Sequence, residues 1–158
     1  MTEPEYAPIK RSSYLAPLSR EHHEGLLLAW KIKHGIRKGI SVQRILLYIN
    51  AFFKEYLAPH FETEERSFSK ILSPDHPLLL QMLQEHKTIE KIITEFSRNR
   101  LHSEVELLDF GKLIQLHIRF EERFLFNHIE SIASPQELAQ LGIDGHQTPP
   151  EWSDPFWL

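Results

Sequence analysis

Sulfur ligands are scarce in this chain, which has no cysteine and only two methionines among its 158 residues. Disulfide bonds and thiolate metal sites of the zinc-finger kind are therefore excluded, and a soft copper(I) site is disfavoured. Any metal that the protein binds must use nitrogen and oxygen ligands.

Signals for a membrane or for nucleic acid are also missing. No apolar segment approaches the length of a membrane-spanning helix, and the N-terminal residues show no basic stretch followed by an apolar run. The net charge of −4 gives no reason to expect nucleic acid as a partner. We expect a cytoplasmic protein that uses neither a membrane nor nucleic acid, and the sequence identifies no protein partner.

Helical periodicity dominates the chain, and no alternating strand pattern competes with it. Turn signals at Gly39, at residues 73–77 and at residues 99–103 separate four long helical stretches. The first is expected from about Ser19, the candidate N-cap, to Arg37, and the second from after Ser41 toward Leu72. The third is expected from near Pro77 to before Asn99, and the fourth from Ser103, which forms a capping-box pattern with Glu106, to about Ile132. Pro59 should kink the second stretch, because its ring removes a backbone donor. A short fifth helix is expected after Ser134.

Four long helices joined by short turns fold most simply as an all-α, up-down-up-down four-helix bundle. We therefore divide the chain into an N-terminal extension (1–17), the bundle (18–133), and a short C-terminal helix with an aromatic tail (134–158). Trp152, Phe156 and Trp157 are large apolar side chains in a proline-rich tail, so we expect them to dock on the bundle.

Three histidines on three of these helices carry a glutamate four residues later. This spacing puts imidazole and carboxylate on one helix face. The pairs are His60 with Glu64, His86 with Glu90, and His117 with Glu121. In a bundle, residues equidistant from a turn lie at the same level, and these histidines are nearly equidistant from the turns between them. The three pairs should therefore meet in one layer.

The first helix can supply a fourth histidine to this layer. Amphipathicity barely separates His22 from His23, and both remain open on that ground. We favour His22 because the dipeptide Glu21-His22 matches Glu85-His86 in the third helix.

The layer should also be buried, because its glutamates lie in apolar stripes that contain no matching lysine or arginine. Buried carboxylates are costly unless they are paired or bind a metal, so a pair of divalent cations would resolve the imbalance. The predicted ligands are His22, His60, Glu64, His86, Glu90, His117 and Glu121. We expect Glu62, Glu65 and Glu122 to face solvent or lie behind the ligands, and His102 with Glu106 to be a solvated pair.

Taken in order, four short strings resemble a hemerythrin-like, cation-binding four-helix-bundle protein. They are Arg20-Glu21-His22, residues 59–65, Glu85-His86 and residues 117–122. The resemblance implies a non-haem di-iron centre in which His22, His60, His86 and His117 bind the ions and Glu64 and Glu121 bridge them. Ferritin-like bundles, the competing di-iron class, use Glu-x-x-His, and no histidine here follows that pattern.

Two positions depart from the oxygen-carrying hemerythrins. Glu90 falls where they have a further histidine, and a carboxylate there would add negative charge and close the position that dioxygen needs. Glu121 is the fourth residue after His117, where the oxygen carriers have Asp at the fifth. These departures argue against reversible oxygen transport.

Three functions remain open at this stage. The protein could hold two iron ions, with manganese or zinc as alternatives, and bind or sense dioxygen, nitric oxide or iron. It could instead be a di-iron oxidase or peroxidase acting on hydrogen peroxide, or a metal-free structural bundle with pH-sensitive histidines. The buried carboxylates argue against the third, and we favour the non-enzymatic module over the enzyme.

Overall fold

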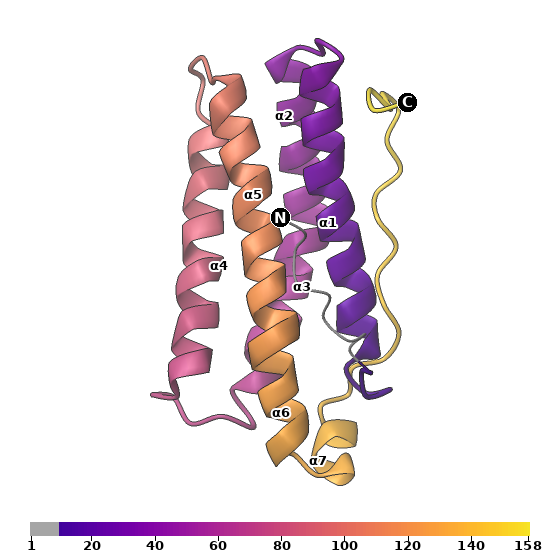
Figure 1. The fold of residues 1–158 in the computed structure, drawn as a ribbon, viewed down its shortest axis with the longest axis vertical. Coiled ribbons are helices and arrows are strands. Elements are labelled where there is room, and N and C mark those ends of the chain that lie inside the picture. Colours follow the sequence, from indigo (N-terminus) through magenta and orange to yellow (C-terminus); the bar gives the residue numbers. More distant parts are fainter. Residues whose placement is uncertain (1–9) are drawn as a thin grey trace, which may run out of the picture.

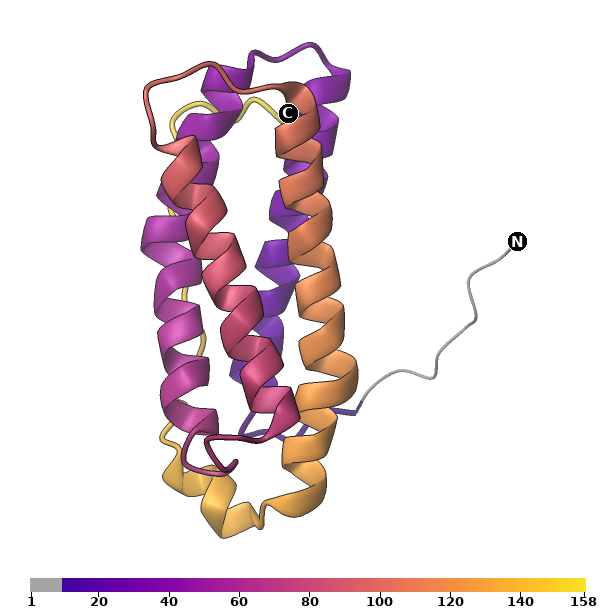
Figure 2. The ribbon, with the colours of Figure 1, turned by 90° about the vertical axis from the view of Figure 1, so that its left-hand side faces the viewer.

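The computed structural model describes residues 10–158, in which all the regular secondary structure is helical and no strand occurs. Four long rods lie side by side (Figures 1 and 2). They are α1 (Ala16–Arg37); α2 (Val42–Phe52), continued by the π-helical turn η1 (Phe53–Leu57) into α3 (Ala58–Phe68); α4 (Pro77–Phe96); and α5 (Glu104–Phe120), continued by a second π-helical turn, η2 (Glu121–Leu125), into α6 (Phe126–Ile132). A short α7 (Pro135–Gln140) follows. None of the described helices combines the length and apolarity needed to cross a membrane.

Local sequence signals account for most helix starts. The Ser41 hydroxyl accepts the Arg44 N–H at the start of α2, and Ser103 with Glu106 forms the expected capping box of α5. Pro77 occupies the first turn of α4, as predicted. The prediction that Ser19 caps the first helix was wrong: α1 begins at Ala16, where the fully buried Leu15 ties its first turn to the core.

The irregularity expected at Pro59 takes the form of η1. There the Ala58 N–H donates to the Phe53 carbonyl, one residue further back than in an α-helix. The wider turn carries the chain into α3, where Pro59 lies in the first turn and needs no N–H partner. The fourth rod contains a second π-helical turn, which starts at Glu121 and contains no proline from which it could be predicted.

The core consists of two apolar clusters. One is built around Ile49, Phe52 and Phe110, and the other around Phe68 and Phe126. On every rod, one or more buried polar residues lie where the chain passes from the first cluster to the second. The bundle therefore encloses a polar layer between two apolar halves.

The C-terminal tail docks on the bundle and runs beside α1 in Figure 1. Phe156 is buried in the first core cluster, and the Lys31 ammonium lies 3.9 Å from the centre of the Trp157 ring. We call residues 142–158 the strap. The predicted N-terminal extension, residues 1–17, falls partly outside the described residues, and its last two residues belong to α1.

Candidate metal centre

Six side chains from all four rods form the polar layer. They are His22 from α1, His60 and Glu64 from α3, His86 from α4, His117 from α5 and Glu121 from η2, and none is more than 4% exposed. Their potential ligand atoms form two overlapping groups of four, each with all atoms within 4.8 Å of one another. One group contains His22 and His60, the other contains His86 and His117, and both contain Glu64 and Glu121.

The two shared carboxylates lie at the centre of the layer. The Nε2 atoms of His22 and His117 lie 2.9 and 3.0 Å from Glu121 Oε1. The Nε2 atoms of His60 and His86 each lie 3.2 Å from Glu64 Oε1. All four imidazoles therefore point the same nitrogen at the same pair of carboxylates.

Several of these inward atoms have no hydrogen-bond partner among the described residues. They are Nε2 of His60, His86 and His117, both carboxylate oxygens of Glu64, and Oε2 of Glu121. Some lie close to one another, but their geometry does not make a hydrogen bond. Leaving one buried polar group unpaired costs about 1–3 kcal/mol, so six in one place need a common partner. Nitrogen and carboxylate donors that converge in a buried layer fit divalent cations.

The outward nitrogen of each imidazole donates to a second carboxylate. His60 Nδ1 lies 2.7 Å from Glu21, and the equivalent distance is 2.8 Å for His86 to Glu65, His117 to Glu85 and His22 to Glu122. We call these four acids the outer carboxylates. Each rod supplies an outer carboxylate to a histidine of the next rod. Glu21 of α1 serves α3, Glu65 of α3 serves α4, Glu85 of α4 serves α5, and Glu122 of η2 serves α1. Such hydrogen bonds fix the ring orientation and leave Nε2 free to face a metal.

The electrostatics of the layer attract positive charge. Burial alone would lower the pKa of His86, but the nearby carboxylates of Glu121, Glu64 and Glu65 outweigh it and raise that pKa to about 11. Burial also opposes the shift at His117, where the Glu121 charge raises the pKa to about 9. Burial and the neighbouring Glu121 charge would raise the pKa of Glu64, yet contacts with His60 and His22 lower it to about 2. Since an imidazole must be neutral to bind a metal, cation binding would displace protons.

The structure brings six of the seven predicted ligands together and excludes one. His22 belongs to the layer, whereas His23 is exposed. Glu90 is exposed on α4 and belongs to neither group, so its prediction as a ligand needs correction. The buried face of α4 continues from His86 to Ile89, three residues later, and this rotation turns Glu90 toward solvent.

The outer carboxylates were only partly anticipated. Glu65 and Glu122 do lie behind the ligands, and Glu62 faces solvent. Glu21 and Glu85 were noticed as neighbours of histidines, but their role was missed because each serves a histidine on another rod. The His102–Glu106 pair lies apart from the layer at the start of α5, yet the His102 side chain packs on Phe96 and is only 1% exposed, so it is not solvated as expected.

A family model for the hemerythrin HHE cation-binding domain matches residues 18–129. The chain belongs to this family. The match extends from α1 into α6 and includes all six residues of the layer and all four outer carboxylates. It leaves out the residues before 18 and the strap. No curated protein and no solved structure shows significant similarity to the chain.

Proposed function

We propose that this hemerythrin-family protein holds two iron ions inside an up-down-up-down four-helix bundle and binds or senses dioxygen, nitric oxide or iron in the cytoplasm. The observation that carries the proposal is the pair of overlapping four-ligand groups that share Glu64 and Glu121. Each ion would have two imidazoles of its own and two bridging carboxylates. Mixed nitrogen and oxygen ligands suit iron, with manganese and zinc as the alternatives.

Four protein ligands per ion leave room for a small exogenous ligand, because non-haem iron also accepts ligands from solution. A cavity of about 10 Å³ adjoins His22, His60 and His117, and its other walls include Leu57, Phe61, Ile114 and Ile118. This is about the space that one water-sized molecule requires. The apolar part of this wall favours a small, weakly polar ligand, and the cavity is too small for an organic substrate.

The argument against reversible oxygen transport changes with the position of Glu90. Because this carboxylate is exposed, it does not close an open position on either ion. The outer carboxylates instead supply extra negative charge close to the imidazoles, which favours the more highly charged, oxidised ions. The proposal therefore keeps the binding or sensing of dioxygen, nitric oxide or iron, while the enzyme alternative is limited to small oxidants such as hydrogen peroxide.

The test is metal analysis combined with optical spectra. Purified protein should carry about two iron ions per chain, and bridged ferric ions should absorb in the near ultraviolet and bleach on anaerobic reduction, whereas zinc is silent. Adding nitric oxide to the reduced protein should give a new spectrum. Peroxide consumption far above that of free iron would favour the enzyme instead.

His22→Ala and His23→Ala form a matched pair for this test, because the two residues are neighbours and only His22 lies in the layer. The first substitution should lower the metal content and the second should not. A protein that binds no cation, or equal losses in both variants, would end the proposal.

A further inference from the structure

The two four-ligand groups contain the same types of donor, two imidazoles and two carboxylates each, but their surroundings differ. We call the site of His22 and His60 the first position and the site of His86 and His117 the second position. Glu64 and Glu121 belong to both. Any difference between the two must therefore come from what lies behind the imidazoles.

At the first position, the N-terminal segment holds the groups behind His22. The Arg11 guanidinium donates to Glu122 Oε2 and to the Glu122 carbonyl oxygen, each at 2.8 Å, and its side chain is only 7% exposed. It also lies 5.3 Å from the centre of the Phe126 ring, which stacks on the His22 ring. Arg11 thus contacts both groups that fix His22 from outside.

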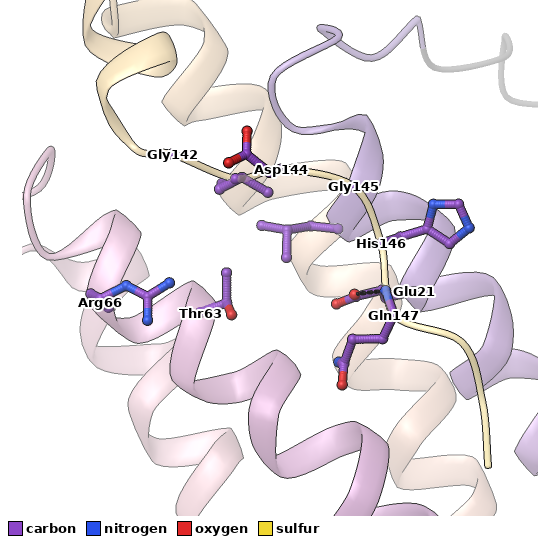
Figure 3. A pocket seen from close by; sticks show the side chains of 10 residues that line it. Glu21, Thr63, Arg66, Gly142, Asp144, Gly145, His146 and Gln147 are labelled. Atoms are coloured by element: carbon purple, nitrogen blue, oxygen red, sulfur yellow. Dashed lines mark hydrogen bonds between the residues drawn. The ribbon is translucent and has the colours of Figure 1, made fainter.

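The strap holds the group behind His60. The Gln147 backbone N–H donates to Glu21 Oε2 at 2.7 Å (Figure 3). The Gln147 side-chain amide also donates to the Tyr56 carbonyl. The Glu21 side chain is 6% exposed. A cavity of about 270 Å³, lined by Glu21, Thr63, Arg66 and residues 142–147, adjoins this contact. The strap therefore closes over Glu21 at the edge of this cavity.

Neither of these segments holds the outer carboxylates of the second position. Glu65 is 38% exposed and, among the described residues, bonds only to His86. Glu85 is 23% exposed, and its second partner is the exposed Gln81 of the same helix. Solvent therefore reaches the groups that support His86 and His117. Glu122 is 20% exposed as well, so what distinguishes it from Glu85 is its contact with Arg11.

We propose that the two cation positions are inequivalent, the second exchanging its ion with solution and the first retaining it under the hold of Arg11 and Gln147. This rests on the proposed two-ion centre. For an ion to leave, an imidazole must swing away, which breaks its Nδ1 hydrogen bond. At the first position the outer carboxylate is itself held and cannot follow the imidazole, so the hydrogen bond is lost in full unless a terminal segment moves as well. Arg11 and Gln147 both lie outside the residues that the family model matches.

Release of zinc from protein loaded with two zinc ions per chain tests the proposal. With excess chromophoric chelator, half of the zinc should leave at least about 10-fold faster than the rest, since groups behind metal ligands change affinity by about 10- to 100-fold. Arg11→Met and Gln147→Pro, which remove the guanidinium and the backbone donor, should each accelerate only the slow phase by about this factor. Gln81→Ala should leave the slow phase unchanged and therefore serves as the matched control.

Two further variants test for a general loosening of the strap and allow for an Arg11 variant that does not fold. Arg44→Ala breaks the exposed ion pair with Asp154 and so loosens the strap far from Glu21; it should change neither phase. Arg11→Lys keeps the charge but loses the planar fork, so it gives a milder form of the same effect if Arg11→Met does not fold. Release of both ions at one rate, or equal acceleration of both phases in the Arg11 and Gln147 variants, would overturn the proposal. Failure to load two ions would instead refute the two-ion centre itself.

Discussion

Replacing Glu121 with glutamine should remove metal from the protein, whereas the same change at Glu90 should not. Both glutamates follow a histidine by four residues, and the sequence predicted both as ligands. Glu121 is fully buried, and its oxygens lie 2.9, 3.0 and 3.5 Å from the Nε2 atoms of His22, His117 and His86. Glu90 is exposed and belongs to neither four-ligand group.

The size of the effect follows from the place of Glu121 in both groups. Changing a residue behind a metal ligand costs about 10- to 100-fold in metal affinity, so losing a shared anionic ligand should cost more than about 100-fold. A cation present at about 100 times its dissociation constant stabilises the fold by about 2.7 kcal/mol per site. For a domain of this size that corresponds to roughly 5–11 °C in melting temperature. This stabilisation should disappear in Glu121→Gln.

The assay compares metal content and melting temperature, with and without added metal, for the unmodified protein and the two variants. Glutamine is nearly isosteric with glutamate, so the metal-induced rise in melting temperature isolates the loss of charge and ligation. Glu90→Gln should retain two ions per chain and the full rise. Two ions retained in Glu121→Gln, or equal losses in the two variants, would refute the assignment of Glu121 to the centre.

Further expectations concern pH and packing. In protein stripped of metal, the pKa of His86 is about 11 against an ordinary value of 6.5. The contribution of His86 to stability should therefore be complete below about pH 6.5 and be lost as the pH rises toward 11, and chemical denaturation at several pH values measures this loss. Zinc affinity should rise over the same pH range, which chelator competition measures. Gly111→Ala should stabilise the fold by about 0.5–1 kcal/mol, because glycine is less favourable than alanine inside a helix and the new Cβ would lie 3.6 Å from Ala29, an ordinary van der Waals distance. A denaturation curve would check this. Gly35→Ala should destabilise it by about 1–3 kcal/mol and shift the tryptophan fluorescence of the strap, because the new Cβ would lie 2.9 Å from the Phe156 ring; unchanged fluorescence would contradict the docked tail.

Local signals made the helical elements readable from the sequence. The caps at Ser41 and Ser103 involve residues only three positions apart, so the chain carries the whole interaction within one turn. The start of α1 was misjudged because burial of Leu15, a long-range contact, outweighed the local capping signal of Ser19. The π turn at Glu121 was also missed, since it has no proline or glycine to mark it.

The ligand set was readable to the extent that it depends on helix periodicity. Four residues advance a helix by slightly more than one turn, so a residue at that spacing lies near the same face without sharing it fully. Whether it points inward depends on how each helix is rotated about its own axis. On α4 the buried series runs from Met82 to His86 to Ile89, which excludes Glu90. Such rotations are set by packing against the other rods.

By itself, the sequence determined the helices, their order and the nitrogen and oxygen donors that any metal must use, because these follow from residue types and from spacings of a few positions. Only the tertiary structure decided which acid supports which imidazole, since every outer carboxylate serves a histidine on a different rod. The same is true of Arg11 and Gln147, whose partners lie 111 and 126 residues away in the chain. Contacts of that range arise from the packing of whole rods and terminal segments, and no local pattern encodes them.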